Sequence, residues 1–405
     1  MTAAGLTEGV PEADSCAEVD RRLGELRERI DGAGYSALIV FGNNKLYGSL
    51  RYLSGFFPDR AGWISVGPRD VYLFEGTVLV VPADGDPILL VEPGLTLRQV
   101  PCIERVSVGS LTSGAEVGLT VPNLVRALTD RDVAGTVGIE TWERFPAPLY
   151  LGLAEAMSGV EFVHSKLVEE MRLVKSPAEI EITRSAARAG DLGHEAFLAA
   201  LADGVGRSEL ELIREAEYVL RTADPIYEDG CANSPSMIAS GTRVAGELLH
   251  PPQPDKTIRE GDIVHWDICS RHLGYSVDTS RTRIVGRPTP DQARAFDASL
   301  SVFGEVVKAA RPGVLAAELV VLADRVARDA GFELWARFLG HGVGIDVHER
   351  PDMGVEETPL AENMTLAIEP RIQSGDYLIG HEDVVRITAD GGEPLNGFPK
   401  QPFEL

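Results

Sequence analysis

The chain has 405 residues, which at roughly 150 residues per domain corresponds to two or three domains with room for a sizeable core. Its 38 basic and 62 acidic residues give a net charge of −24, and a field of that sign repels phosphate groups, so we expect no nucleic-acid partner. No apolar run approaches the ~18–20 residues of a membrane span, so we expect no membrane partner, and the acidic N-terminus is unlike a signal peptide. The four cysteines lie far apart and form no paired metal-binding pattern, which predicts reduced thiols in a cytoplasmic protein.

The N-terminal part of the chain predicts a mixture of helices and strands. From residue 17 to about residue 34, apolar residues recur at steps of three and four and a glycine closes the segment, as in an amphipathic helix. Residues 36–41 form a short apolar run, which we interpret as a buried strand. Further strands are expected at residues 71–74, 77–81 and 88–91, the last two joined by a Pro- and Gly-rich turn as in a hairpin.

Near residue 168 the pattern changes to longer helices. Ser176-Pro177-Ala178-Glu179 has the signature of a capping box with proline at the first helical position, and a helix is expected from Ile180 towards Ala202. We therefore predict an N-terminal α/β domain over residues 1–165 and a second domain of α/β (α+β) type over residues 166–405.

The second domain contains an internal repeat. Gly204-Val205 is followed by Glu209-Leu210, and Gly313-Val314 is followed at the same spacing by Glu318-Leu319, an offset of 109 residues. Each copy follows a helical segment and precedes strand-rich sequence with two carboxylates. The shared order of elements predicts a duplicated unit.

Side chains that could bind a metal lie in four short segments of the second domain. An apolar pattern predicts two strands joined near residues 271–274, a hairpin that brings Asp267 and Asp278 together. Two carboxylates forced close repel each other, and a bound divalent cation is the usual remedy. His341 and His348 would face opposite sides of a regular strand, but the glycines between them let the backbone bend, so both rings could reach one cavity.

Two glutamates complete this set of side chains. Glu369 and Glu382 each lie in or beside an apolar strand, where an unpaired carboxylate is energetically costly. Taken singly, each carboxylate could also be an exposed residue at the end of a strand. Taken together, four oxygen donors and an imidazole suit Mn²⁺, Co²⁺, Fe²⁺ or Zn²⁺. Four carboxylates carry too much negative charge for one divalent ion, which favours two ions bridged by shared carboxylates.

The combined motif resembles that of a known superfamily. The two Asp, the HGxGxxxHE segment beginning at His341, Ile368-Glu369-Pro370 and Glu382-Asp383 are similar to the pita-bread metallopeptidases, which include methionine aminopeptidase, aminopeptidase P, prolidase and creatinase. A separate N-terminal domain resembles the prolidase, aminopeptidase P and creatinase branch. The resemblance implies a creatinase-like N-terminal domain and a duplicated pita-bread catalytic domain. It also implies a dinuclear metal-dependent hydrolase in which a metal-bound hydroxide attacks the amide bond before proline in a dipeptide or short peptide.

The resemblance implies a metal-binding role for five residues and a cofactor of two divalent ions, Mn²⁺ first and Co²⁺, Zn²⁺ or Fe²⁺ as alternatives. The implied metal ligands are Asp267, Asp278, His341, Glu369 and Glu382. Asp278 and Glu382 would bridge the two ions, and Glu369 would also accept a proton from the bridging water.

Four further residues are implied on the substrate side or around the ligands. His348 and His250 match the substrate-side histidines of the family, and Arg281 matches an arginine that orients the ligand carboxylates. This branch is commonly dimeric, with the N-terminal domain of one subunit near the active site of the other. The loop at residues 52–60 is the candidate contact because it holds aromatic residues and Arg60, which we assign to substrate binding in a homodimer. The same loop could instead pack on its own domain.

Three positions depart from the peptidase pattern. Cys269 stands where glycine is usual, Gly380 where arginine is frequent, and Arg371 where glycine is common. Cys269 shares a strand face with Asp267, so its thiol could reach the metal site or could simply pack in a core. Because these changes surround the metals and the substrate, the alternative is a creatinase-like enzyme that acts on a small non-peptide metabolite by C–N hydrolysis or lyase chemistry. A non-catalytic binding protein is disfavoured because all five ligand positions are filled.

Overall fold

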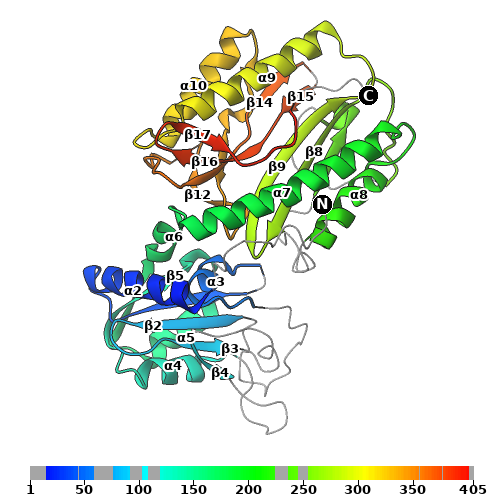
Figure 1. Ribbon diagram of the computed structural model, residues 1–405. Helices are drawn as coiled ribbons and strands as arrows, with labels where there is room; N and C mark the ends of the chain where they lie inside the picture. Colours follow the sequence, from blue (N-terminus) through cyan, green and yellow to red (C-terminus); the bar gives the residue numbers. More distant parts are fainter. Residues whose placement is uncertain are drawn as a thin grey trace. The chain divides into compact units, whose positions relative to one another are not determined.

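The computed structural model describes residues 15–43, 45–58, 76–91, 103–107, 119–223, 236–244, 254–354, 356–375 and 377–400. The contacts within the chain divide it into two compact units, the first ending at Arg172 and the second continuing from Leu173 (Figure 1). Among the described helices, none is both long enough and apolar enough to cross a membrane. The expected strand at residues 71–74, Arg60 and His250 lie outside the described residues.

The first unit is built on a six-stranded mixed sheet with the strand order β4-β3-β2-β1-β5-β6. Its strands are β1 (Ala37–Gly42), β2 (Thr77–Pro82), β3 (Ile88–Val91), β4 (Glu104–Ser107), β5 (Gly135–Glu140) and β6 (Val160–Ser165). β2 pairs antiparallel with both β1 and β3, which confirms the expected hairpin, whereas β1 pairs parallel with β5. Every residue of β1 is buried, as expected for a strand covered on both faces.

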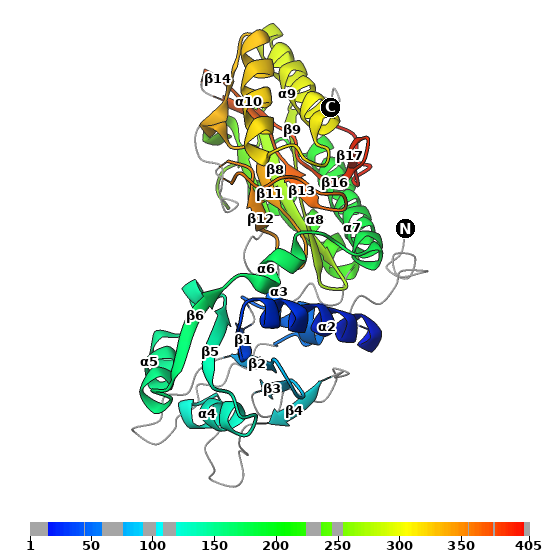
Figure 2. The same cartoon turned by 90° about the vertical axis from the view of Figure 1, so that its left-hand side faces the viewer.

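Helices cover the two faces of this sheet. They are α2 (Cys16–Gly32), α3 (Gly48–Ser54), α4 (Val121–Thr129), the 3-10 helix η1 (Trp142–Arg144), α5 (Ala147–Ala156) and α6 (Leu167–Arg172). Figure 2 shows α2 on one side of the sheet and α4 and α5 on the other. Leu128 of α4 and Leu149 of α5 pack with Ile39 of β1 in one core.

Helix α2 confirms the amphipathic helix expected from residue 17. Ser15 caps it by accepting a hydrogen bond from the main-chain N–H of Glu18, and Val19 and Ile30 are among its buried residues. One part of the sequence analysis is wrong here, because Cys16 is disulfide-bonded and not a reduced thiol. The wide separation of the cysteines in sequence carries no information about which of them meet in space.

The second unit contains two helix pairs, each followed by strands. Its helices are α7 (Pro177–Ala202), α8 (Glu209–Ala223), η3 (Gly241–Val244), α9 (Pro290–Ala309), α10 (Ala316–Asp329) and η4 (Trp335–Arg337). The capping box at the start of α7 is confirmed, because the Ser176 hydroxyl accepts from Glu179 N–H while the Glu179 carboxylate accepts from Ser176 N–H. The order of two helices and then strands occurs twice, as the internal repeat predicts.

Three sheets lie among these helices (Figure 1). One sheet is formed by β7 (Met237–Ser240), β8 (Ile263–His272) and β9 (Tyr275–Ile284) in that order. The second has the order β12-β11-β13-β16-β17, with β12 (Glu349–Asp352), β11 (Gly340–Gly342), β13 (Thr365–Ile368), β16 (Asp383–Thr388) and β17 (Gly391–Pro394). The third has the order β10-β14-β15, with β10 (Glu333–Leu334), β14 (Arg371–Ser374) and β15 (Tyr377–Gly380).

The register of the β8–β9 hairpin decides which side chains share a face of this sheet. Leu273 and Gly274 form its two-residue turn and both have positive φ, 47° and 84°, the backbone that matches the twist of paired strands. Cys269 lies directly opposite Asp278 in the register. Because side chains alternate along a strand, Asp267, Cys269 and Asp278 share one face and Arg281 lies on the other.

Candidate metal centre

Five buried side chains converge from five different segments of the second unit. They are Asp267 on β8, Asp278 on β9, His341 on β11, Glu369 immediately after β13 and Glu382 immediately before β16. Main-chain hydrogen bonds fix the two glutamates at their strand ends, Glu369 N–H to Leu339 O and Glu382 N–H to Ser280 O.

The ligand atoms of these residues form overlapping groups. The imidazole Nε2 of His341 lies 3.7 Å from Asp278 Oδ2 and 3.7 Å from Glu369 Oε1. In each of three groups, the possible ligand atoms all lie within 4.8 Å of one another. The groups are Asp278, His341 and His348; Asp267, Cys269 and Asp278; and His341, Glu369 and Glu382. Because Asp278 and His341 belong to two groups each, the three groups form one continuous site.

Several polar atoms of this site have no hydrogen-bond partner in the described part of the chain. They are Asp267 Oδ1, His341 Nε2 and both carboxylate oxygens of Glu382. His341 Nδ1 lies 2.9 Å from Gly342 O, so a proton on Nδ1 satisfies that carbonyl and leaves the lone pair of Nε2 facing the carboxylates. Buried acceptors without donors are costly, and bound divalent cations would satisfy these atoms, so these residues fit a metal.

Burial and mutual repulsion raise the pKa values of the carboxylates. Burial, opposed in part by Arg371, raises the pKa of Asp267 to about 6. Burial and then the neighbouring carboxylates raise the pKa of Asp278 and that of Glu382 well above their ordinary values. The pKa of Glu369 is also raised by burial, against the opposing effect of Arg371. A cation bound beside these carboxylates would favour their ionised forms, because a nearby positive charge lowers the pKa of a carboxyl group.

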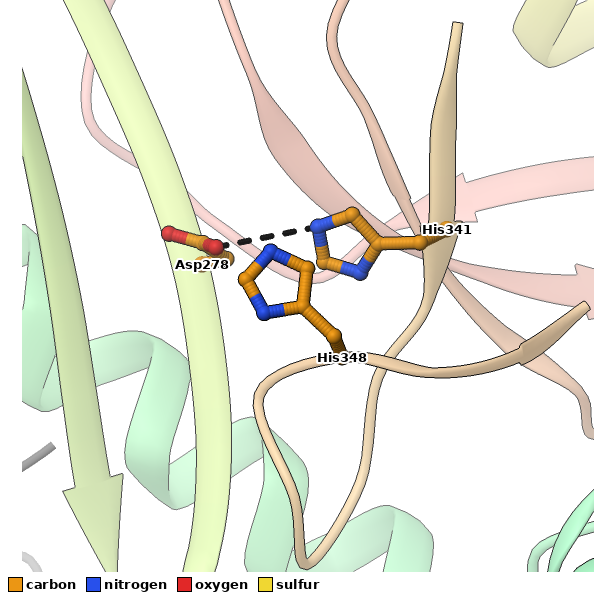
Figure 3. Close-up of side chains that lie close together, drawn as sticks. All are labelled: Asp278, His341 and His348. Carbon is orange, nitrogen blue, oxygen red and sulfur yellow. Dashed lines mark ion pairs between the residues drawn. The ribbon is translucent and has the colours of Figure 1, made fainter. Parts of the chain in front are cut away.

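The two histidines of the glycine-rich segment reach the same place, as expected from the sequence. Their ring centroids are 4.1 Å apart, and Figure 3 shows both rings and Asp278 directed towards one another. The close backbone passage requires glycine at Gly340, where φ is 136° and a Cβ would collide with the carbonyl oxygen of Ala367. His348 is exposed, unlike the five buried residues, and desolvation of its ring, with His341 beside it, lowers its pKa to about 4.

Two of the three positions that depart from the peptidase pattern contribute side chains to the site. Cys269 carries a thiol whose Sγ donates to Asp278 Oδ1 at 3.1 Å, so this thiol does reach the site. Arg371 lies with Nη2 2.6 Å from Glu369 Oε2 and 3.9 Å from Asp267 Oδ2. From the sequence, Arg371 was expected only as a departure from the peptidase pattern and not as a residue of the site. Its place after Glu369-Pro370 was the only sequence signal.

Arg281 contacts the segment that carries Glu382. It lies on the opposite face of β9 from Asp278 and its hydrogen bonds reach Glu382 O at 2.6 Å and Asp383 Oδ1 at 2.7 Å. The alternation of β9 directs the Arg281 side chain away from the ligand carboxylates, so Arg281 would orient Glu382 through the main chain, and its role stays a prediction.

A buried ion pair that the sequence analysis missed supports the loop of His348. Lys175 Nζ donates to Glu349 Oε2 at 3.1 Å, and Glu349 Oε1 accepts from Asp346 N–H at 3.0 Å. The pair joins residues 174 positions apart, a separation for which a single sequence gives no signal.

Comparisons with known proteins agree with this geometry. Residues 181–389 match metallopeptidase family M24, and residues 22–174 match the creatinase/prolidase N-terminal domain. The chain is 29% identical to Xaa-Pro dipeptidase from Pyrococcus furiosus over 342 residues, which cover 81% of this chain and 91% of that protein.

Solved structures show the same fold. The chain superposes on dipeptidase PepE from Mycobacterium ulcerans with a TM-score of 0.75 and 27% identity, covering 96% of this chain and 98% of that one. It superposes on prolidase from Thermococcus sibiricus with a TM-score of 0.76 and 22% identity, covering 95% and 98%. The expected creatinase-like N-terminal domain and pita-bread catalytic domain are confirmed. The chain therefore belongs to metallopeptidase family M24 and is an enzyme that resembles Xaa-Pro dipeptidases.

Proposed function

We propose that the chain is a dinuclear metal-dependent peptidase that hydrolyses the amide bond before proline in dipeptides or short peptides. The observation that carries this proposal is the buried set of four carboxylates and one imidazole, several of whose atoms lack partners within the described residues. The Xaa-Pro dipeptidase relatives support the substrate class. We propose Mn²⁺ as the native metal, with Co²⁺, Zn²⁺ or Fe²⁺ as alternatives, because most of the donors are carboxylate oxygens.

We propose that the two ions share carboxylates. Asp267 would hold one ion, and His341 and Glu369 the other, with Asp278 and Glu382 bridging. The two oxygens of Asp278 support this division, since Oδ1 faces Cys269 on the Asp267 side and Oδ2 faces His341. Arg281 would be a positioning residue that holds the main chain of Glu382.

The chemistry follows from the residues around the ions. Divalent ions bound there supply a nucleophile by lowering the pKa of water, and they polarise the scissile carbonyl. We assign to His348 the donation of an N–H hydrogen bond to the carbonyl oxygen, because its pKa of about 4 keeps the imidazole neutral near pH 7. We assign to Glu369 the acceptance of a proton from the attacking water. His250 and Arg60 would contact the substrate in a cytoplasmic homodimer.

The test is a metal reconstitution with matched peptides. Protein stripped with a chelator should be inactive, and Mn²⁺ should restore hydrolysis of Ala-Pro but not of Ala-Ala, with two ions bound per chain. Asp278→Ala should lose metal and activity, whereas Asp297→Ala, on the exposed surface of α9, should keep both. One ion per chain would contradict the dinuclear centre, and cleavage of Ala-Ala alone would contradict the proline specificity.

A small non-peptide substrate is the second candidate. Arg371 and the Cys269 thiol lie in the site at positions where the peptidase pattern has glycine. A metal-loaded protein that leaves every Xaa-Pro dipeptide and tripeptide intact but cleaves the C–N bond of a small amide or amidine would favour this function.

A further inference from the structure

Arg371 and Gly380 are direct neighbours across two strands. Arg371 is the first residue of β14, Gly380 is the last residue of β15, and the two are paired in the antiparallel register. The guanidinium of Arg371 is buried between carboxylates from two separate segments, 2.6 Å from Glu369 Oε2 and 3.9 Å from Asp267 Oδ2.

The space at Gly380 is what admits the Arg371 side chain. A Cβ on residue 380 would lie 2.9 Å from Arg371 Cγ, closer than real side chains approach. The φ of Gly380 lies outside the left-handed region, so the backbone does not demand glycine there and the packing does.

The two departures from the peptidase pattern are therefore related. The pattern has arginine at position 380 and glycine at position 371, and this chain has the reverse. Cβ atoms of directly paired residues lie only about 4.5–5.5 Å apart. A long arginine side chain can therefore bring its guanidinium to the same carboxylates from either strand.

We propose that Arg371 is a positioning residue of the metal centre and that Arg371 and Gly380 act as one exchanged pair. The inference rests on the proposed metal centre. The guanidinium donates a hydrogen bond to Glu369 Oε2 and leaves Glu369 Oε1 facing His341 Nε2, so Glu369 would offer one oxygen to a bound ion. Arg371 also adds one positive charge to a cluster of four carboxylates.

The experiment measures Mn²⁺ binding by calorimetry on chelator-stripped protein, together with kcat and KM on the best substrate. Arg371→Met and Arg371→Gly should weaken binding of Mn²⁺ about 10- to 100-fold, the usual effect of removing a group that orients a ligand. They should lower kcat more than they raise KM. Arg386→Met, on β16 and hydrogen-bonded to Asn363 away from the site, is the matched control and should bind Mn²⁺ like the wild type.

The pairing is tested by the exchange. Arg371→Gly combined with Gly380→Arg should recover most of the lost affinity, because the guanidinium returns from the neighbouring strand. Gly380→Ala should weaken binding in the wild type but have no effect in the Arg371→Gly background, where the colliding side chain is gone. Arg371→Lys keeps the positive charge and the aliphatic part of the side chain, so it serves as the test variant if the Met and Gly variants do not fold. It should bind Mn²⁺ at least about threefold more weakly than the wild type, because lysine lacks the planar guanidinium.

The outcomes separate this inference from the proposed function. Wild-type protein that binds no divalent metal would overturn the metal centre itself. Wild-type protein that binds Mn²⁺ normally, with every Arg371 variant within twofold of it, would overturn only the role of Arg371. An exchange variant no better than Arg371→Gly would overturn the pairing with Gly380.

Discussion

Glu382→Gln should stabilise the metal-free protein and destabilise the metal-loaded protein relative to the wild type. Glu382 is buried, and neither carboxylate oxygen has a partner in the described structure. Leaving a buried polar group unsatisfied costs about 1–3 kcal/mol and more when the group is charged, and glutamine keeps the shape while removing the charge and its repulsion by the neighbouring carboxylates. We therefore expect a gain of about 2 kcal/mol, or about 4–8 °C in Tm for a unit of this size.

The gain should depend on pH in a defined direction. Burial and the neighbouring carboxylates raise the pKa of Glu382 in the folded state above its ordinary value of 4.5. Below about pH 4.5 the carboxylate is protonated in both the folded and unfolded states and costs nothing. As the pH rises through and above that value, the unfolded state releases its proton first, so the folded state loses stability. The advantage of Glu382→Gln should be largest near pH 8 and should vanish near pH 4.5.

Thermal melts followed by circular dichroism, with chelator or with excess Mn²⁺, measure both effects. At 100 times its dissociation constant, a ligand stabilises the wild type by about 2.7 kcal/mol, and the variant should not receive this gain. Glu305→Gln, on the exposed surface of α9, is the control and should stay within about 0.5 kcal/mol of the wild type. A metal-free Glu382→Gln protein that melts at or below the wild type at pH 8, with equal stabilisation of both by Mn²⁺, would refute the reasoning.

Three other outcomes are expected. His348→Ala and His250→Ala should keep their metal, measured by plasma mass spectrometry, while turnover falls about 10²–10⁴-fold, and loss of metal would make that histidine a ligand instead. Lys175→Met removes the ammonium group that pairs with the buried Glu349 carboxylate and should lower the free energy of unfolding in urea by about 3–5 kcal/mol. It should also lower kcat, because the His348 loop loses this contact, and an unchanged urea midpoint would contradict the prediction. Light scattering should give a homodimer, and Arg60→Ala should raise KM with metal content unchanged; a monomer with a silent Arg60→Ala would confine the site to the second unit.

The sequence predicted those parts of the site that depend on local spacing. The turn at Leu273-Gly274 and the period-two alternation of its strands were sufficient to bring Asp267 and Asp278 onto one face. The same alternation, applied to Arg281, predicts that it lies on the opposite face of the hairpin.

The parts that the sequence could not predict depend on long-range packing. Lys175 meets Glu349 across 174 positions, and Arg371 reaches Asp267 from a different sheet. Nothing in the local pattern specifies either neighbour, because each contact exists only after the sheets have packed together. The significance of Gly380 also appears only from the space beside it.

The ligands are distributed over both copies of the internal repeat. Asp267 and Asp278 lie before residue 285, whereas His341, Glu369 and Glu382 lie after residue 290, and the chain passes from one group to the other through the connection between β9 and α9. Neither half alone carries a complete ligand set, so metal capture reports the docking of one half on the other. A chain cut in that connection would be a two-fragment complementation system. The divalent ion would stabilise the association of the fragments, and its binding would report that association.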